Sequence, residues 1–259
     1  MASENKDPFE SAKKRLRRGN QHVARTKKRV EKFFRSNPYA KVVEIDADGV
    51  TQLHKIKLTK PFPESPTESA LEALDALRSV LDQAGYAAAI LSGKESPKKT
   101  HFPFADTKER LENIVAKQCR DLPQEIIELF RSFEPYRDGN QALWAMNKIR
   151  NSTHTALIPV GVAVDGLHMN SGFMAAGESG SVAIHQPVWN SAKNEMIFAS
   201  VGPNSSFEYD MNINFKVIFD DADIAPSQSA IRLLELAATE VAHILKATEA
   251  ECYRIGLLK

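Results

Sequence analysis

The chain has 259 residues, a net charge of +1, and a composition ordinary for a soluble globular protein, with 42% hydrophobic and 26% charged residues. Its length fits one large domain or two tightly packed ones. No apolar run approaches the ~20 residues that cross a bilayer, and the first twenty residues lack the apolar core of a secretory signal. Cys119 and Cys252 are too few for a disulfide scaffold. We therefore expect a cytoplasmic protein with reduced thiols and no membrane partner.

The first 35 residues are strongly basic, with 12 Lys and Arg against 4 Asp and Glu. Phe9, Leu16, Val23 and Val30 recur every seven residues, which predicts one amphipathic helix of about 28 residues that ends near Pro38. Its charges either contact nucleic acid or form a solvated face against an acidic body. The candidates for nucleic-acid contact are Lys13, Lys14, Arg17, Arg18, Arg25, Lys28 and Arg29.

The next segments alternate between strand and helix signals. Residues 41–58 are typical of a β-hairpin with its turn at Asp48-Gly49. Leucines at helical spacing predict a helix over 66–91, and three shorter helices are expected at about 106–120, 123–133 and 139–151.

After residue 155 the pattern changes to β-branched and aromatic runs at 156–164, 181–189, 195–202 and 206–219. A long closing helix follows. Segregated helices and strands predict an α+β fold: an N-terminal helix and hairpin, a helical bundle, an antiparallel sheet and a long C-terminal helix. We expect three segments, 1–37, 38–156 and 157–259, packed as one unit. The two terminal helices can pair with each other or with a second copy of the chain.

Motifs for cofactors and metals are missing. No two histidines are three or four residues apart, no C-x-x-C occurs, and "GESGS" lacks the lysine of a phosphate loop. We expect neither a metal site nor a cofactor.

Two pairs of polar residues have helical spacing. Arg150 and His154 are four apart, with Asn151 between them, at the junction from helix to strand. An arginine can stabilise a phosphate and a histidine can accept a proton near neutral pH, although both residue types also complement the dipole at a helix C-terminus. Arg78 and Asp82 are also four apart, which predicts either a surface ion pair or a pair that orients a neighbouring helix.

Five stretches of the chain resemble, in their order and spacing, the motifs of a family of uncharacterised bacterial proteins. They are "RSNPYAKVVEID", "LEALDALRSVLDQAGYAAA", "THFPFADTKERLENIV", "IIELFRSFEPY" and "ALWAMNKIRNSTH". The paired helices are reminiscent of the HEPN superfamily, whose helical bundles include ribonucleases and defence toxins. Those nucleases place four to six residues between an arginine and a histidine, whereas three separate Arg150 from His154. The resemblance implies a HEPN-like helical bundle and a site shared by two chains.

Two functions remain open. The first is a homodimeric binding or regulatory module that contacts RNA or an acidic protein partner through its basic helix, with Arg78, Asp82 and Asn147 in a structural polar network. The second is a HEPN-like, metal-independent ribonuclease in which Arg150 contacts the scissile phosphate, His154 acts as base and Asn151 orients both.

Overall fold

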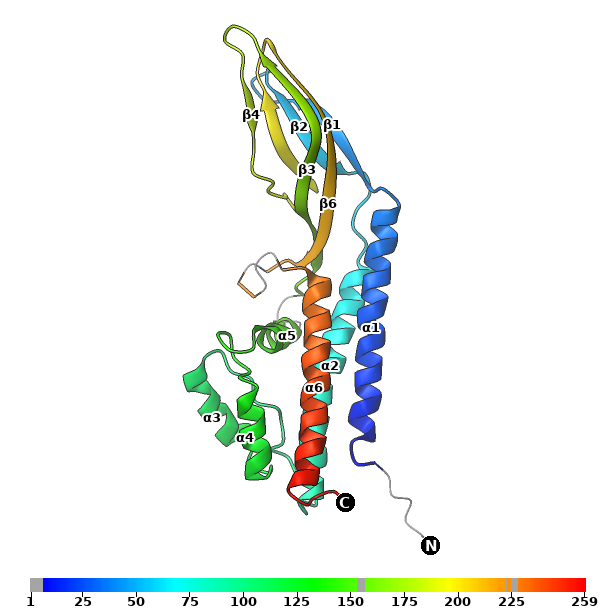
Figure 1. The fold of residues 1–259 in the computed structure, drawn as a ribbon, viewed down its shortest axis with the longest axis vertical. Helices are drawn as coiled ribbons and strands as arrows, with labels where there is room; N and C mark the ends of the chain where they lie inside the picture. The colour runs from blue at the N-terminus through cyan, green and yellow to red at the C-terminus, as the bar shows by residue number, and fades with distance from the viewer. Residues whose placement is uncertain (1–6, 153–156, 222, 225–227) are drawn as a thin grey trace. The chain divides into compact units, whose positions relative to one another are not determined.

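The structure is a computed structural model that describes residues 7–152, 157–221, 223–224 and 228–259. These residues form a mixed α+β fold with antiparallel sheets and a C-terminal helix (Figure 1). The helices are α1 (Glu10–Arg35), α2 (Ser65–Leu91), α3 (Lys108–Gln118), α4 (Gln124–Ser132), α5 (Gln141–Ser152) and α6 (Ala230–Arg254). The strands are β1 (Tyr39–Ile45), β2 (Gln52–Leu58), β3 (Val160–Ala176), β4 (Val182–Ile184), β5 (Glu195–Val201) and β6 (Ser205–Phe219). Of the helices described, none has the length and apolar character of a membrane span.

The chain divides into two compact units built from interleaved segments. The helical unit contains Met1–Lys27, Ser65–Ile158 and Asp221–Lys259, and the sheet unit contains Lys28–Glu64 and Pro159–Asp220. These units do not coincide with the segments 1–37, 38–156 and 157–259 expected from the sequence. The hairpin lies in the sheet unit because β2 pairs with β5, more than 130 residues later in the chain.

In the helical unit, α1 and α6 lie along α2 (Figure 1). The predicted seven-residue stripe faces inward, since Phe9 and Val23 are buried and Leu16 is half-buried. Gly19 lets the helices approach closely, because a Cβ at this position would lie 3.0 Å from Cδ2 of Leu77 on α2. The packing thus buries the apolar stripe and leaves the basic residues of α1 at its margins.

In the sheet unit, a four-stranded antiparallel sheet of order β1-β2-β5-β4 packs against the two-stranded ribbon β3-β6. Asp48 and Gly49 lie in the connection between β1 and β2, where the Gly49 N–H donates to the Asp46 carbonyl at 3.0 Å and Gly49 has a φ of +76°. The predicted alternation of β6 is confirmed, since alternate side chains on one face are buried or half-buried. The core shared by the two sheets contains Ile56, Met196, Phe198, Ala199, Val201, Phe207, Met211 and Ile213.

Candidate functional site

A small polar pocket in the helical unit lies between α2 and α5. Its volume is about 180 Å³. Both polar clusters predicted from the sequence contribute to it, although about 70 residues separate them along the chain. The lining residues are Arg78, Ser79, Asp82, Phe104, Gln118, Asn147, Arg150 and Asn151.

Arg78 contacts three other residues that line the pocket. Its guanidinium forms an ion pair with Asp82, and its Nε donates a hydrogen bond to Oδ1 of Asn147 at 3.3 Å. The guanidinium carbon also lies 4.6 Å from the ring centroid of Phe104, a cation–π contact. The structure therefore brings Arg78, Asp82 and Asn147 into direct contact, as the predicted polar network requires.

Arg150 lies in the last turn of α5 and is held by carbonyl and carboxylate oxygens. Its Nε and Nη2 both lie 3.4 Å from Oδ1 of Asp75 on α2, and its Nη1 donates to Oδ1 of Asn151 at 3.2 Å. The second oxygen of Asp75 accepts from Arg15 of α1 at 3.0 Å. One carboxylate thus contacts guanidinium groups of two other helices, α1 and α5.

His154 lies outside the described residues, so the structure does not place the histidine that the sequence pairs with Arg150. A different histidine lies beside the pocket. Nδ1 of His101 is 3.5 Å from Oδ1 of Asp82, and the His101 side chain is 54% exposed. The same Asp82 oxygen accepts the backbone N–H of Phe102 at 3.0 Å, which holds the carboxylate in place.

Sequence reasoning missed Asp75, His101, Phe104 and Gln118. Asp75 lies on α2 among residues whose spacing does not distinguish it, and Gln118 is the last residue of α3. His101 and Phe104 lie in the connector between α2 and α3, which has no periodicity. The segment "THFPF" contains both His101 and Phe104 and is too short to show periodicity. A signal for its role would have been the pair of aromatic residues, since the Phe102 and Phe104 rings pack at a tilt with centroids 5.0 Å apart, and Phe104 also contacts Arg78 of α2.

The basic residues of α1 are largely paired with carboxylates. Lys13 contacts Asp7 and Glu249 at 2.9 and 2.6 Å, and Lys14 and Arg17 both contact Glu10. Arg25 lies 3.7 Å from Glu72.

Two further candidates for nucleic-acid contact on α1 differ from these in their ion pairing. Within the described parts of the chain, neither Arg18 nor Lys28 forms an ion pair, whereas Arg29 has an interaction of its own. The acidic partners on α2 and α6 support the interpretation that much of this charge rests against an acidic body.

No family model, curated protein or solved structure matches the chain. In the portion of the chain that is described, no three His, Cys, Asp or Glu side chains gather closely enough to hold a metal ion.

Proposed function

We propose that this protein is a binding module whose helical unit takes a small oxyanion, such as a phosphate group, in the pocket between α2 and α5. The observation that carries this proposal is that two guanidinium groups, Arg78 and Arg150, line the same small pocket. Guanidinium groups present several N–H donors in a planar array that matches the oxygens of phosphate and carboxylate groups.

The size and lining of the pocket support a small polar ligand. About 180 Å³ is less than the ~300 Å³ at which pockets for drug-sized molecules begin. Asn147, Asn151 and Gln118 add amide groups that can donate to further oxygens. Since Asp82 and Asp75 already neutralise part of the positive charge, the pocket favours one oxyanion of low charge over a polyanion.

The test is thermal unfolding of the full chain in increasing inorganic phosphate. Binding to the folded state raises the midpoint, and Arg150→Gln should abolish that increase. Arg120→Gln is the matched control, because Arg120 is an exposed arginine of the same unit that does not line the pocket. Equal shifts in all three proteins would refute the proposal.

A second candidate function, metal-independent cleavage of RNA, is favoured by the position of His101. A carboxylate beside one nitrogen of a histidine orients the ring and leaves the other nitrogen to accept a proton. His101 beside Asp82, with Arg78 and Arg150 in the adjoining pocket, offers a base and cations for a phosphodiester.

This alternative is tested by incubating the protein with a mixed RNA pool in EDTA. Cleavage that survives His154→Ala but is lost in His101→Ala would assign the base to His101, and the reverse result would assign it to His154. Absence of cleavage by the wild-type protein would leave the oxyanion-binding module as the function.

The proposal includes a HEPN-like helical bundle, a homodimer and an RNA contact through α1. The order of the motifs, which resembles that family, supports the first, and the second follows from the site shared by two chains that the resemblance implies. Light scattering of the purified chain should give twice the monomer mass.

The RNA contact is tested by the salt dependence of binding. Arg18→Gln with Lys28→Gln should weaken RNA binding and reduce the slope of log affinity against log salt by about 1.4, or 0.7 for each lost phosphate contact. Lys13→Gln should leave the slope unchanged, because the Lys13 ammonium is already bound by Asp7 and Glu249. A wild-type affinity that does not depend on salt would rule out the contact.

A further inference from the structure

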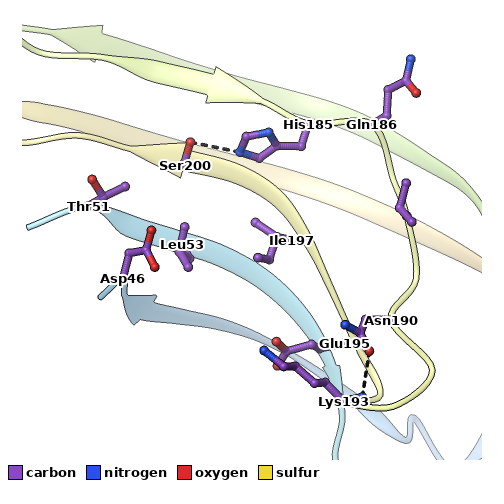
Figure 2. A pocket seen from close by; sticks show the side chains of 11 residues that line it. Asp46, Thr51, Leu53, His185, Gln186, Asn190, Lys193, Glu195, Ile197 and Ser200 are labelled. Atoms are coloured by element: carbon purple, nitrogen blue, oxygen red, sulfur yellow. Dashed lines mark hydrogen bonds between the residues drawn. The ribbon is translucent and has the colours of Figure 1, made fainter. Parts of the chain in front are cut away.

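The sheet unit contains a larger groove that is independent of the helical pocket. Its volume is about 580 Å³, within the range of small-ligand sites. It lies on the face of the four-stranded sheet that points away from the core, since Leu53 alternates with the buried His54 along β2. The lining residues are Asp46, Thr51, Leu53, His185, Gln186, Val188, Asn190, Lys193, Glu195, Ile197 and Ser200 (Figure 2).

One wall of the groove is the segment after β4, and it is fastened to β5 at both ends. At one end the backbone N–H of His185 donates to the carbonyl of Phe198 at 2.8 Å, and Nε2 of His185 lies 3.0 Å from Oγ of Ser200. At the other end Asn190 and Glu195 exchange two backbone hydrogen bonds. Between these anchors the wall carries Val188, whose side chain is 73% exposed and lines the groove.

The floor is apolar and the ends are polar. Figure 2 shows Leu53 and Ile197 between the end that carries Asp46 and Thr51 and the end that carries Lys193. An apolar floor between polar ends favours a linear ligand whose middle is apolar.

The two ends differ in charge. Most charges on this face of the sheet are paired, since Glu195 lies 3.3 Å from Lys55 and 3.5 Å from Lys57. Within the described residues, however, neither Asp46 nor Lys193 forms an ion pair. The groove thus presents an anion at one end and a cation at the other.

The strand register gives the distance between these ends. Gln52 pairs with Val201 at the Asp46 end, and Lys57 pairs with Glu195 at the Lys193 end. Five residues of a β-strand span about 16 Å, at roughly 3.3 Å per residue. An extended peptide of about five residues has this length.

We propose that the groove binds a short free peptide in an extended conformation. Its amino group lies toward Asp46, its carboxylate lies toward Lys193, and a central apolar side chain rests on Leu53 and Ile197. The side-chain amides of Gln186 and Asn190 can donate to the carbonyl groups of a peptide backbone, whereas the hydroxyls of Thr51 and Ser200 are already bonded to Asp48 and His185.

The test is calorimetric titration of the full chain with the pentapeptide Ala-Ala-Leu-Ala-Ala, once with free termini and once acetylated and amidated. The free peptide should bind, and blocking each terminus should weaken binding about three- to fivefold, as expected for a partly exposed ion pair. Lys193→Gln should remove the effect of amidation, and Asp46→Asn should remove the effect of acetylation. Each variant changes an exposed side chain, so the fold is retained and tryptophan fluorescence verifies it.

Matched controls are Lys60→Gln and Asp220→Asn, which remove exposed charges of the same unit that do not line the groove. Both should bind like the wild-type protein. Absence of binding at about 10 mM free peptide, or equal binding of free and blocked peptides, would overturn the proposal. Loss of phosphate binding in the helical pocket would not affect it.

Discussion

Asp75 decides how strongly Arg150 can hold a ligand. Its carboxylate contacts both Arg15 and Arg150, so an incoming oxyanion competes with it for the guanidinium of Arg150. The competition is modest, because the Asp75 side chain is 49% exposed and solvent screens the pair.

We predict that Asp75→Asn tightens phosphate binding by about threefold and lowers the free energy of unfolding by less than about 1 kcal/mol. Unfolding midpoints measured at increasing phosphate concentrations give both the affinity for phosphate and the change in stability. Glu112→Gln is the control, since Glu112 pairs with Arg131 away from the pocket. Weaker binding in Asp75→Asn would mean that the carboxylate positions Arg150 instead of competing with the ligand.

His54 is a buried ionisable group in the core of the sheet unit. Its ring lies 5.5 Å from the rings of Phe207 and Tyr209, and its Nδ1 is 3.2 Å from the Tyr209 hydroxyl. Burial lowers the pKa of His54 and raises the pKa of Tyr209, because both charged forms lose hydration.

The lowered pKa of His54 predicts that acid destabilises the sheet unit. Below pH ~6.5 His54 binds a proton in the unfolded chain, whereas in the folded unit its lowered pKa keeps it neutral. The stability that His54 contributes is therefore complete above this pH and falls as the pH drops through it. Denaturation followed by Trp189 fluorescence in a Trp144→Phe background at pH 7.5 and 5.5 measures the change. His54→Asn should remove this dependence and Tyr209→Phe should retain it; a His54→Asn protein as acid-sensitive as the wild type would contradict the assignment.

At the scale of elements, Gly85 lies in the interior of α2, although glycine is unfavourable there, because the chain that packs against the helix leaves no room for a side chain. A Cβ at this position would lie 2.3 Å from the backbone carbonyl oxygen of Thr100, so the connector could not pass so close to α2. Gly19 differs, because its nearest neighbour is the side chain of Leu77, which can move.

We predict that Gly85→Ala destabilises the protein by about 1–3 kcal/mol, the typical cost of overpacking, although alanine is favoured in a helix by about 1 kcal/mol. Gly19→Ala should change stability by less. Denaturant midpoints of the two variants measure the difference. A stabilised Gly85→Ala protein would show that the connector can move away from the helix.

At the scale of the molecule, each unit has its own core and its own probes. Trp144 lies in the helical unit and Trp189 in the sheet unit. Both cysteines lie in the helical unit, where burial raises the pKa of Cys119 to about 12 and that of Cys252 to about 11. Their thiols are therefore protonated and inaccessible in the folded state.

We predict that dithiodipyridine labels neither thiol in the native protein and labels both once the helical unit unfolds. Between pH 7.5 and 5.5 the His54 penalty applies to the sheet unit alone, so the Trp189 transition should move to lower denaturant concentration while the thiol transition keeps its midpoint. Equal shifts of the two transitions would mean that the two units unfold as one cooperative body.

Much of the secondary structure could be predicted from the sequence, because its signals are local. The stripe of α1, the turn at Asp48-Gly49, the helix over Ser65–Leu91 and the alternation of β6 each depend on neighbours within a few residues. The Arg78–Asp82 ion pair is equally local, since residues four apart share a helix face.

Only the tertiary structure decided where the clusters meet. Arg78 and Arg150 share a pocket, Asp75 joins residues 60 and 75 positions away, and His101 lies beside Asp82. The hairpin became part of the sheet unit because β2 pairs with β5. Such contacts depend on the packing of whole helix faces and sheet edges, and many partners are compatible with each face. The sequence by itself therefore determined the elements and their polar residues, and long-range packing determined which of these residues form a site.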